Sequence, residues 1–356
     1  MFVLDSHCDT PSQILRLRDL SIDNEYAHVD FHKLKAGGVD GAFFALYIPA
    51  SLDSDPSAAW AYAMKLYDGV MNSLKENPER AALATSREEA LENKKKGLFS
   101  VFLALENASP IGDSIERLQM LYDMGIRYIT LCHTGNNGVC DSCATEVKRW
   151  GGLSPFGKEL VAEMNRLGIL VDVSHVSDDT FYDVISCSKY PVVATHSCCR
   201  ALAAHPRNLT DEMICSLAEK GGVIQINFYP VFLDSEFTFV LKASGIMERG
   251  EVIEHEFIMD PADCQKREAW NAVQKELLHL ERPSYKLIAD HIDHVVGLVG
   301  VDHVGFGSDF DGIAVAPDGM ENASCFYRIL DELRDRGYTE EELEKIAGDN
   351  FFRLMA

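Results

Sequence analysis

The sequence contains no uninterrupted apolar run of about 20 residues, which is the length that a membrane-spanning helix needs. It is also poor in basic residues, because 33 Lys and Arg stand against 56 Asp and Glu, a formal net charge of −23. Nucleic-acid-binding proteins present a basic surface to the phosphates, and anionic lipid surfaces attract basic segments. The composition therefore argues against nucleic-acid and membrane partners.

Two further absences limit the fold. No Gly-rich phosphate-binding loop follows an early predicted strand, which disfavours the alternative of a doubly wound open sheet. No low-complexity tract and no Ser/Gly-rich linker divides the chain, so composition marks no domain boundary. A length of 356 residues is compatible with one large domain or with two smaller ones.

An export signal is not predicted either. The segment Met1–His7 lacks a basic n-region and becomes polar early, so it predicts a strand rather than a signal peptide. The ten cysteines are scattered, and without an export signal we expect reduced thiols in a cytoplasmic protein. Cys140 and Cys143 have the spacing of half a zinc knuckle, but the adjacent Cys198 and Cys199 do not supply the other half, and a structural zinc is not predicted there.

Short β-branched or aromatic runs alternate with amphipathic stretches, and this alternation occurs eight times. Nearly continuous apolar runs are typical of parallel strands that are buried on both faces. The expected strands are Phe2–Asp9, Gly41–Ile48, Leu98–Leu105, Tyr128–His133, Ile169–His175, Val192–His196, Val223–Phe228 and Val304–Asp309. The expected helices include Ser57–Leu74, Ser114–Met124, Pro155–Leu167, Asp211–Lys220 and Tyr285–Val299.

Eight β-then-α units predict a closed (β/α)8 barrel of the TIM type, since short right-handed crossovers then connect each strand to the next. We expect a single domain over residues 1–356. The one stretch without a regular pattern lies at about 230–283 and is rich in acidic residues. We interpret it as an acidic surface excursion over the barrel rather than a regulatory domain.

Five of the expected strands end in residues that bind metals. These residues are His7, Asp9, Glu106, His175, His196 and Asp309. Each one alone could be a polar residue that marks where a strand leaves the core. The C-terminal strand ends of a barrel converge on one pocket, however, and three imidazoles and three carboxylates placed there would destabilise one another without a cation. The pattern therefore predicts a metal site at this end of the barrel.

The segments around these residues resemble the membrane dipeptidase family, the renal dipeptidase-like metallopeptidases of the amidohydrolase superfamily. The matching segments run in order along the chain: Asp5-Ser6-His7-Cys8-Asp9-Thr10, Leu105-Glu106-Asn107, Leu131-Cys132-His133, Asp172-Val173-Ser174-His175-Val176-Ser177, Thr195-His196-Ser197, His205-Pro206-Arg207-Asn208, Gly307-Ser308-Asp309-Phe310-Asp311-Gly312 and Gly348-Asp349-Asn350-Phe351. The chain departs from the secreted animal members because it shows neither a signal peptide nor a lipid-anchor tail, so the membrane part of the family's name is not carried over.

The resemblance implies a binuclear zinc centre, with two Zn2+ ions per chain. His7 and Asp9 would hold the first ion, His175 and His196 the second, and Glu106 would bridge the two, together with a water or hydroxide. The number of ligands agrees, because a catalytic zinc usually keeps three protein ligands and an open position. Five ligands shared between two ions about 3.5–4 Å apart leave room for a bridging water.

The resemblance also implies residues that contact the substrate. His133 matches the residue that contacts the scissile carbonyl oxygen, with a loop-capping histidine as the alternative. Arg207 matches the arginine that binds the free carboxylate of the substrate, a role suited to a planar guanidinium, although a surface arginine is the alternative. Tyr229 follows the seventh expected strand and is a candidate for the pocket wall. The histidines without a strand-end position, His28, His32, His205, His255, His279, His291, His294 and His303, are predicted to be structural or solvated.

The leading hypothesis is a zinc dipeptidase in which a metal-bridging hydroxide attacks the peptide carbonyl, while Asp309 receives the proton of the attacking water and passes it to the leaving amine. An amidohydrolase that acts on another amide or a lactone is the first alternative, and a metal-binding protein without turnover is the second. Arg207 favours a free dipeptide, and Asp309 favours turnover. The family suggests a homodimer, and the sequence leaves open the side chains preferred and whether L,D-dipeptides are accepted.

Overall fold

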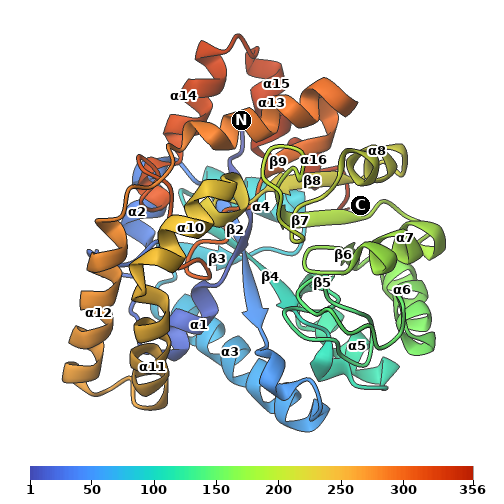
Figure 1. Ribbon diagram of the computed structural model, residues 1–356, viewed down its shortest axis with the longest axis horizontal. Coiled ribbons are helices and arrows are strands. Elements are labelled where there is room, and N and C mark those ends of the chain that lie inside the picture. The colour runs from blue at the N-terminus through green and yellow to red at the C-terminus, as the bar shows by residue number, and fades with distance from the viewer. Residues whose placement is uncertain (356) are drawn as a thin grey trace.

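Eight parallel strands form a nearly closed barrel in the structure, a computed structural model that describes residues 1–355 (Figure 1). The strands hydrogen-bond in the order β1 (Leu4–Cys8), β2 (Gly41–Tyr47), β4 (Phe99–Glu106), β5 (Ile126–Thr130), β6 (Leu170–Asp172), β7 (Val193–Ser197), β8 (Val223–Ile226) and β9 (Val304–Phe306). The ring closes just beyond the strand ends, where Cys8 pairs with Phe310 and the Asp9 N–H donates to the Phe310 carbonyl at 2.9 Å. The predicted (β/α)8 barrel is therefore confirmed.

The strands form because their residues can be buried on both faces. Every residue of β4 is buried, as the continuous apolar run predicts. Inside the barrel, Phe43 stacks on Phe102 with ring centroids 4.8 Å apart, and Phe351 near the C-terminus lies 5.0 Å from Phe43. This aromatic cluster fills the barrel toward the N-terminal ends of the strands. The functional site of such a barrel lies at the opposite end, where the strands end.

Helices surround the strands (Figure 1). They are α1 (Thr10–Leu15), α2 (Phe31–Gly37), α3 (Pro56–Glu76), α4 (Arg87–Lys95), α5 (Ile115–Asp123), α6 (Pro155–Leu167), α7 (Asp178–Cys187), α8 (Asp211–Glu219), α13 (Lys286–Val299), α14 (Tyr327–Asp335), α15 (Glu340–Glu344) and α16 (Asn350–Phe352). The Ser154 hydroxyl caps α6 by accepting from the Gly157 N–H, and Gly168 ends the helix at φ 78°. The five helices expected from the sequence are present, and a ninth strand, β3 (Ala81–Leu83), pairs with β4 outside the ring.

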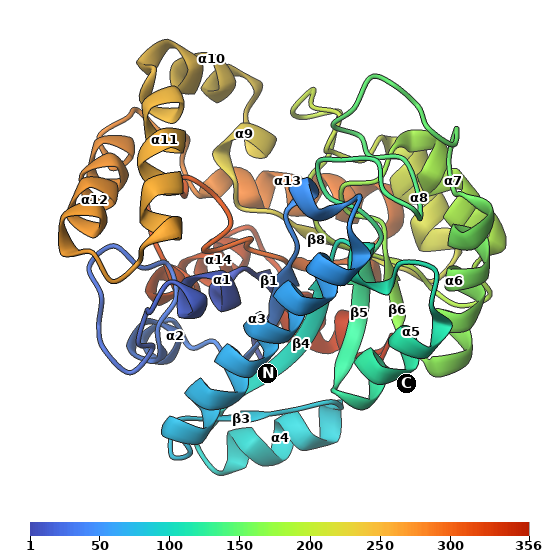
Figure 2. The ribbon, with the colours of Figure 1, turned by 90° about the horizontal axis from the view of Figure 1, so that it is seen from below.

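The stretch at about 230–283 is helical, so its description as irregular is wrong. It forms α9 (Pro230–Leu233), α10 (Ser235–Ser244), α11 (Ile246–Met259) and α12 (Cys264–Leu278). Figure 2 shows α10, α11 and α12 grouped on one flank of the barrel, beside the segment that follows α1. Phe237, Ile246 and Leu277 belong to a small apolar core of its own, separate from the barrel core. We call this segment, α10 to α12, the helical excursion.

The described residues 1–355 contain no helix that is both long enough and apolar enough to cross a membrane.

Candidate active site

The predicted metal ligands and Asp309 meet at the C-terminal ends of the strands, but Asp9, His175 and Asp309 lie beyond the last strand residue. His7 and His196 lie within β1 and β7, and Glu106 is the last residue of β4. His175 and Asp309 lie three residues beyond β6 and β9, so the expected strands were too long at these ends. His175 and Asp309 have φ values of 70° and 62°, which are uncommon for residues with side chains and are tolerated chiefly where the surroundings fix them.

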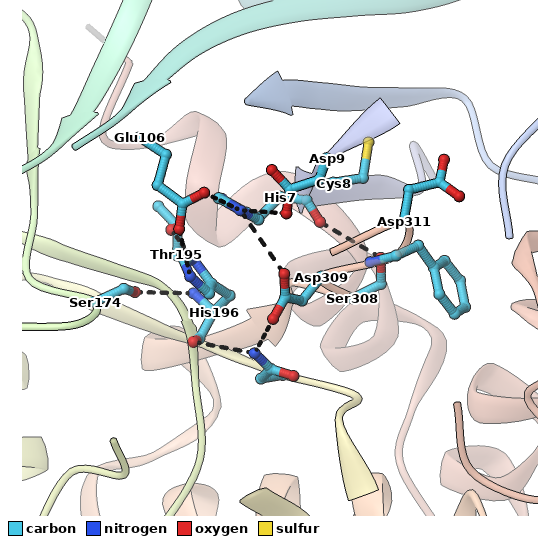
Figure 3. A network of polar contacts seen from close by, with 12 residues as sticks. His7, Cys8, Asp9, Glu106, Ser174, Thr195, His196, Ser308, Asp309 and Asp311 are labelled. Carbon is cyan, nitrogen blue, oxygen red and sulfur yellow. Dashed lines mark hydrogen bonds and ion pairs between the residues drawn. The ribbon is translucent and has the colours of Figure 1, made fainter. Parts of the chain in front are cut away.

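Glu106 lies between two groups of candidate metal ligands, and Figure 3 shows its contacts with one member of each group, His7 and His196. One of its oxygens, Oε1, is 3.1 Å from His175 Nε2 and 3.4 Å from His196 Nε2. The other oxygen, Oε2, is 3.6 Å from His7 Nε2, which in turn is 3.7 Å from Asp9 Oδ2. A carboxylate with one oxygen toward each group has the arrangement of a bridging ligand.

The donor set of this cluster fits a cation. His7 Nε2, Asp9 Oδ1 and Glu106 Oε2 are buried and have no hydrogen-bond partner within residues 1–355. Leaving buried polar atoms unpaired costs free energy, and a metal ion that accepts their lone pairs removes this cost. Imidazole nitrogens and carboxylate oxygens are the ligands of zinc in hydrolytic sites.

A buried tyrosine sets the tautomer of His7. Tyr128 donates its hydroxyl proton to the Ser6 carbonyl at 2.9 Å, and the same oxygen lies 2.7 Å from His7 Nδ1. Because the hydroxyl proton is already used, His7 Nδ1–H donates to Tyr128. The lone pair of His7 is therefore on Nε2, the atom that faces Glu106.

A second chain of hydrogen bonds sets the tautomer of His196 in the same way. Thr195 donates its hydroxyl proton to Asp172 Oδ2 at 2.7 Å, and its oxygen lies 2.8 Å from His196 Nδ1. His196 therefore carries its proton on Nδ1 and directs the lone pair of Nε2 toward Glu106. Thr130 also donates to Asp172 Oδ2, at 2.5 Å, which fixes the carboxylate.

The protonation states of His175, His196 and Glu106 also agree with metal binding. Burial lowers the pKa of His175 and of His196 well below the usual range, so both imidazoles are neutral. Burial opposes ionisation of Glu106, but His7, together with His175 and His196, holds the pKa of its carboxyl well below the usual value. Neutral imidazoles and an ionised carboxylate are the forms that bind a metal. Against the effect of burial, Glu106 and Asp9 raise the pKa of His7 well above its usual value, so a metal that binds His7 Nε2 must displace a proton.

Asp309 is held beside the cluster with one oxygen anchored. Asn227 Nδ2–H donates to Asp309 Oδ2 at 2.9 Å, and the Asp309 N–H donates to the His7 carbonyl at 3.0 Å. The other oxygen, Oδ1, lies 4.0 Å from His7 Nε2 (Figure 3). Burial raises the pKa of Asp309, and the neighbouring Glu106 raises it further, so this carboxyl is a weaker acid than an exposed one.

The three predicted substrate residues lie around this cluster. The His133 ring is tilted by 42° against the His175 ring with centroids 4.2 Å apart, and its Nδ1 is buried without a hydrogen-bond partner among the described residues. Arg207 is buried and donates from Nη1 to Ser197 Oγ and from Nη2 to the His196 carbonyl, both at 2.7 Å. Its Nε–H has no partner within residues 1–355, so Arg207 is not a solvated surface arginine.

Tyr229 lies beyond β8, and burial together with Asp309 raises the pKa of its hydroxyl to about 12. Its ring packs edge-on against the Phe232 ring, with centroids 5.1 Å apart. The Arg207 guanidinium lies over the same Phe232 ring, 5.7 Å from its centroid. These residues connect the arginine end of the site to the helical excursion.

Comparisons with known proteins identify the family of this chain. A sequence profile of the membrane dipeptidase family, peptidase family M19, matches residues 1–356. The chain belongs to this family. It is therefore a peptidase hydrolase of a metallo-dipeptidase family, which favours an enzyme over the alternative of a metal-binding protein without turnover.

Two curated relatives are similar along almost the whole chain. Dipeptidase aclJ of Aspergillus oryzae is 31% identical over 350 residues, which cover 97% of this chain and 73% of that protein. Dipeptidase verJ of Clonostachys rogersoniana is 30% identical and covers 99% of this chain and 83% of that protein. Both are named as dipeptidases, which agrees with dipeptide hydrolysis as the activity of this M19 chain.

Solved M19 structures share the fold. The probable dipeptidase PvdM from Pseudomonas aeruginosa superposes with a TM-score of 0.81 at 25% identity, covering 100% of this chain and 94% of that chain. A metallopeptidase from Rhodobacter sphaeroides, solved with a phosphinate mimic of the dipeptide L-Ala-D-Ala, superposes with a TM-score of 0.78 at 25% identity, covering 100% and 98%. The fold and the family agree, and the family implies a metal cofactor.

The sequence analysis did not identify the residues that orient this M19 site. Tyr128 contacts His7 and Asn227 contacts Asp309, whereas Asp172 reaches His196 only through Thr195. Asp172 had one signal, because a carboxylate inside a buried strand requires hydrogen-bond donors. Two histidines with helical spacing proved structural, since His291 accepts from the Cys199 N–H and His294 pairs with Asp211 at 2.8 Å.

Proposed function

We propose that this protein is a zinc-dependent dipeptidase that binds two Zn2+ ions and hydrolyses free dipeptides. His7 and Asp9 would hold one ion, His175 and His196 the other, and Glu106 would bridge them. The observation that carries this proposal is the position of Glu106, whose two oxygens face two different groups of imidazole and carboxylate ligands. When bound, the zinc ions supply a water of lowered pKa and polarise the scissile carbonyl.

Arg207 would bind the C-terminal carboxylate of the dipeptide. Two of its N–H groups are fixed by Ser197 and by the His196 carbonyl, which leaves the buried Nε–H free for an acceptor on the substrate. A charge-assisted hydrogen bond from a preorganised guanidinium is stronger than a neutral one. A longer peptide would place its next residue against this arginine, so the pocket would select free dipeptides.

His133 would donate a hydrogen bond to the carbonyl oxygen as negative charge develops there. Burial lowers the pKa of His133, so the imidazole is neutral and keeps one N–H for this role. Asp309 would receive the proton of the attacking water and transfer it to the leaving amine. Its free oxygen Oδ1 faces the cluster, while Asn227 holds Oδ2 in place.

L,D-dipeptides belong to the proposed substrate range. The support is the Rhodobacter sphaeroides structure, whose ligand is a phosphinate mimic of L-Ala-D-Ala. A panel of matched L,L- and L,D-dipeptides, assayed for release of free amino acids, tests this part.

The decisive experiment compares a free dipeptide with the same dipeptide as its C-terminal amide. We expect Arg207→Ala to raise KM for the free dipeptide about ten-fold or more, because the charge-assisted hydrogen bonds are lost. The amide has no carboxylate to lose, so its already low turnover should change little. Equal losses on both substrates would show that Arg207 supports the fold and not recognition.

A further inference from the structure

A cavity lies between the barrel and the helical excursion, next to the candidate metal ligands His7, Asp9, Glu106, His175 and His196. We call this group of residues the metal cluster. The volume of the cavity is about 390 Å3, and it is lined by the segment that follows α1, by α11 and α12, and by the loop after β9. Figure 2 shows these elements together on one flank of the molecule. Pockets of a few hundred Å3 are the size of small-molecule sites.

This cavity and the metal cluster share two wall residues. Gly312 lines the cavity, and a Cβ atom placed on it would lie 2.0 Å from Asp9 Oδ2 and 2.7 Å from Asp309 Oδ1. Tyr229 also lines the cavity, and its hydroxyl is influenced by the charge of Asp309. At the wall formed by Gly312, the cavity therefore lies directly against the carboxylates of Asp9 and Asp309.

Among the charged residues that line the cavity, Arg267 and Asp19 form no ion pair within residues 1–355. Arg16 pairs with Glu254 at 2.9 Å, and Arg18 pairs with Asp311 at 2.6 Å. Arg267, on α12, donates from Nη2 to the Pro261 carbonyl at 2.7 Å but forms no ion pair with any carboxylate of the described chain. Asp19 is exposed and accepts from the Ser21 N–H at 2.8 Å, whereas Arg267 is partly buried.

The cavity also presents a hydrogen-bond donor and an apolar wall. His28 Nδ1 accepts from the Asp311 N–H at 3.0 Å, so the ring proton is on Nε2, which has no hydrogen-bond partner within residues 1–355. Burial lowers the pKa of His28 to about 4, which keeps the ring neutral. Trp270 and Phe257 supply apolar surface between these polar groups. The lining therefore suits a side chain with an apolar stem and an anionic end.

The polarity of the active site indicates which part of a dipeptide lies beside this cavity. Arg207, after β7, would hold the C-terminal carboxylate, whereas Asp309, after β9 and close to Gly312, would attract the N-terminal ammonium. A dipeptide held between these ends has its N-terminal residue next to Gly312 and Tyr229.

We propose that the cavity beside the helical excursion receives the side chain of the N-terminal residue, and that Arg267 selects dipeptides whose N-terminal residue is acidic. This inference rests on the proposed dipeptidase function. It assigns to the helical excursion a role in substrate selection, which the metal cluster itself does not provide.

The test uses three substrates of the zinc-loaded full-length protein: Glu-Ala, its uncharged isostere Gln-Ala, and Ala-Ala. The wild type should hydrolyse Glu-Ala with a kcat/KM about ten-fold above that of Gln-Ala, because only the carboxylate forms a charge-assisted pair. Arg267→Gln should remove this preference and leave Ala-Ala turnover unchanged. Arg267→Lys should keep part of it, and Arg267→Glu should shift the preference toward Lys-Ala.

The matched control is Arg249→Gln. Arg249 is also on the helical excursion, pairs with Glu276 at 2.6 Å and does not line the cavity, so the Glu-Ala preference should persist. Equal wild-type rates on Glu-Ala and Gln-Ala, or an equal loss on all three substrates in Arg267→Gln, would overturn the inference. Turnover of Ala-Ala by the wild type distinguishes a failure of the Arg267 inference from a failure of the dipeptidase proposal. If the wild type does not hydrolyse Ala-Ala, the dipeptidase function itself is contradicted.

Discussion

The metal cluster and the cavity beside the helical excursion are built in opposite ways. In the cluster, His7, Glu106 and His196 are fixed by strands and by buried hydrogen bonds that extend to Tyr128 and Thr195. The cavity wall is formed by helices with exposed charges and a small separate core. The difference indicates that the barrel carries the chemistry, which tolerates little change, while the helical excursion carries selectivity, which can vary without loss of the catalytic geometry.

The largest expected effect is that of Glu106→Gln. An amide cannot bridge two cations with two anionic oxygens, so this variant should lose nearly all dipeptidase activity and most of its bound zinc. Elemental analysis should find about two zinc ions per wild-type chain and fewer in the variant, while circular dichroism shows an intact fold. A wild type that binds one ion or none after growth with zinc would contradict the binuclear centre.

Asp309→Asn separates metal binding from proton transfer. The amide keeps the size of the side chain and its contact with Asn227, so both zinc ions should remain. Turnover should fall by on the order of 10²–10⁴, because the amide cannot receive the proton of the attacking water. Near-normal turnover in this variant would mean that another group moves the proton.

Tyr128→Phe tests whether the hydrogen bonds behind the cluster matter for the metal. The change removes the oxygen that accepts the His7 Nδ1–H and leaves the ring in the barrel interior. Zinc affinity should fall roughly 10–100-fold, as for other groups that orient a metal ligand. Competition with a zinc chelator measures the shift, and an unchanged affinity would show that His7 needs no such partner.

The smallest effect is expected at the helical excursion, from a substitution in its ion pair with the barrel. Arg16 and Glu254 join the segment after α1 to the helical excursion at 2.9 Å, and both side chains are partly exposed. Such pairs contribute less than about 1 kcal/mol, so Glu254→Gln should shift the thermal midpoint by less than about 3 °C. Activity on Ala-Ala should stay at the wild-type level. A large loss of stability would mean that the helical excursion is as firmly joined to the fold as the barrel strands are.

Most of the barrel and the strand-end positions of the candidate metal ligands were predictable because they depend on local patterns. Continuous apolar runs mark strands buried on both faces, and a His or Glu at the end of such a run, as at Glu106 or His196, is unusual enough to be noticed. Motif segments matched to a known family added His133 and Arg207, which no local pattern would identify.

The remaining features depend on contacts between distant residues. Tyr128 reaches His7 across 121 positions of the sequence, so its role follows from the barrel's closure and not from its neighbours in the chain. The helices of the excursion were missed because α11 and α12 are rich in charge and bury few residues each. The loop positions of His175 and Asp309 reflect positive φ angles, which hydrophobic periodicity does not encode.

The closure of the barrel between β1 and the loop after β9 has a consequence for protein synthesis. His7 and Asp9 are made first, but Asp309 and the Phe310 carbonyl that pairs with Asp9 are made about three hundred residues later. A nascent chain that ends before β9 therefore contains all five candidate metal ligands but has an open sheet edge and lacks Asp309. Because the barrel that brings these ligands together closes only when nearly the whole chain has left the ribosome, we expect metal loading to follow synthesis, and a truncated product would carry the ligands without the closed barrel that positions them.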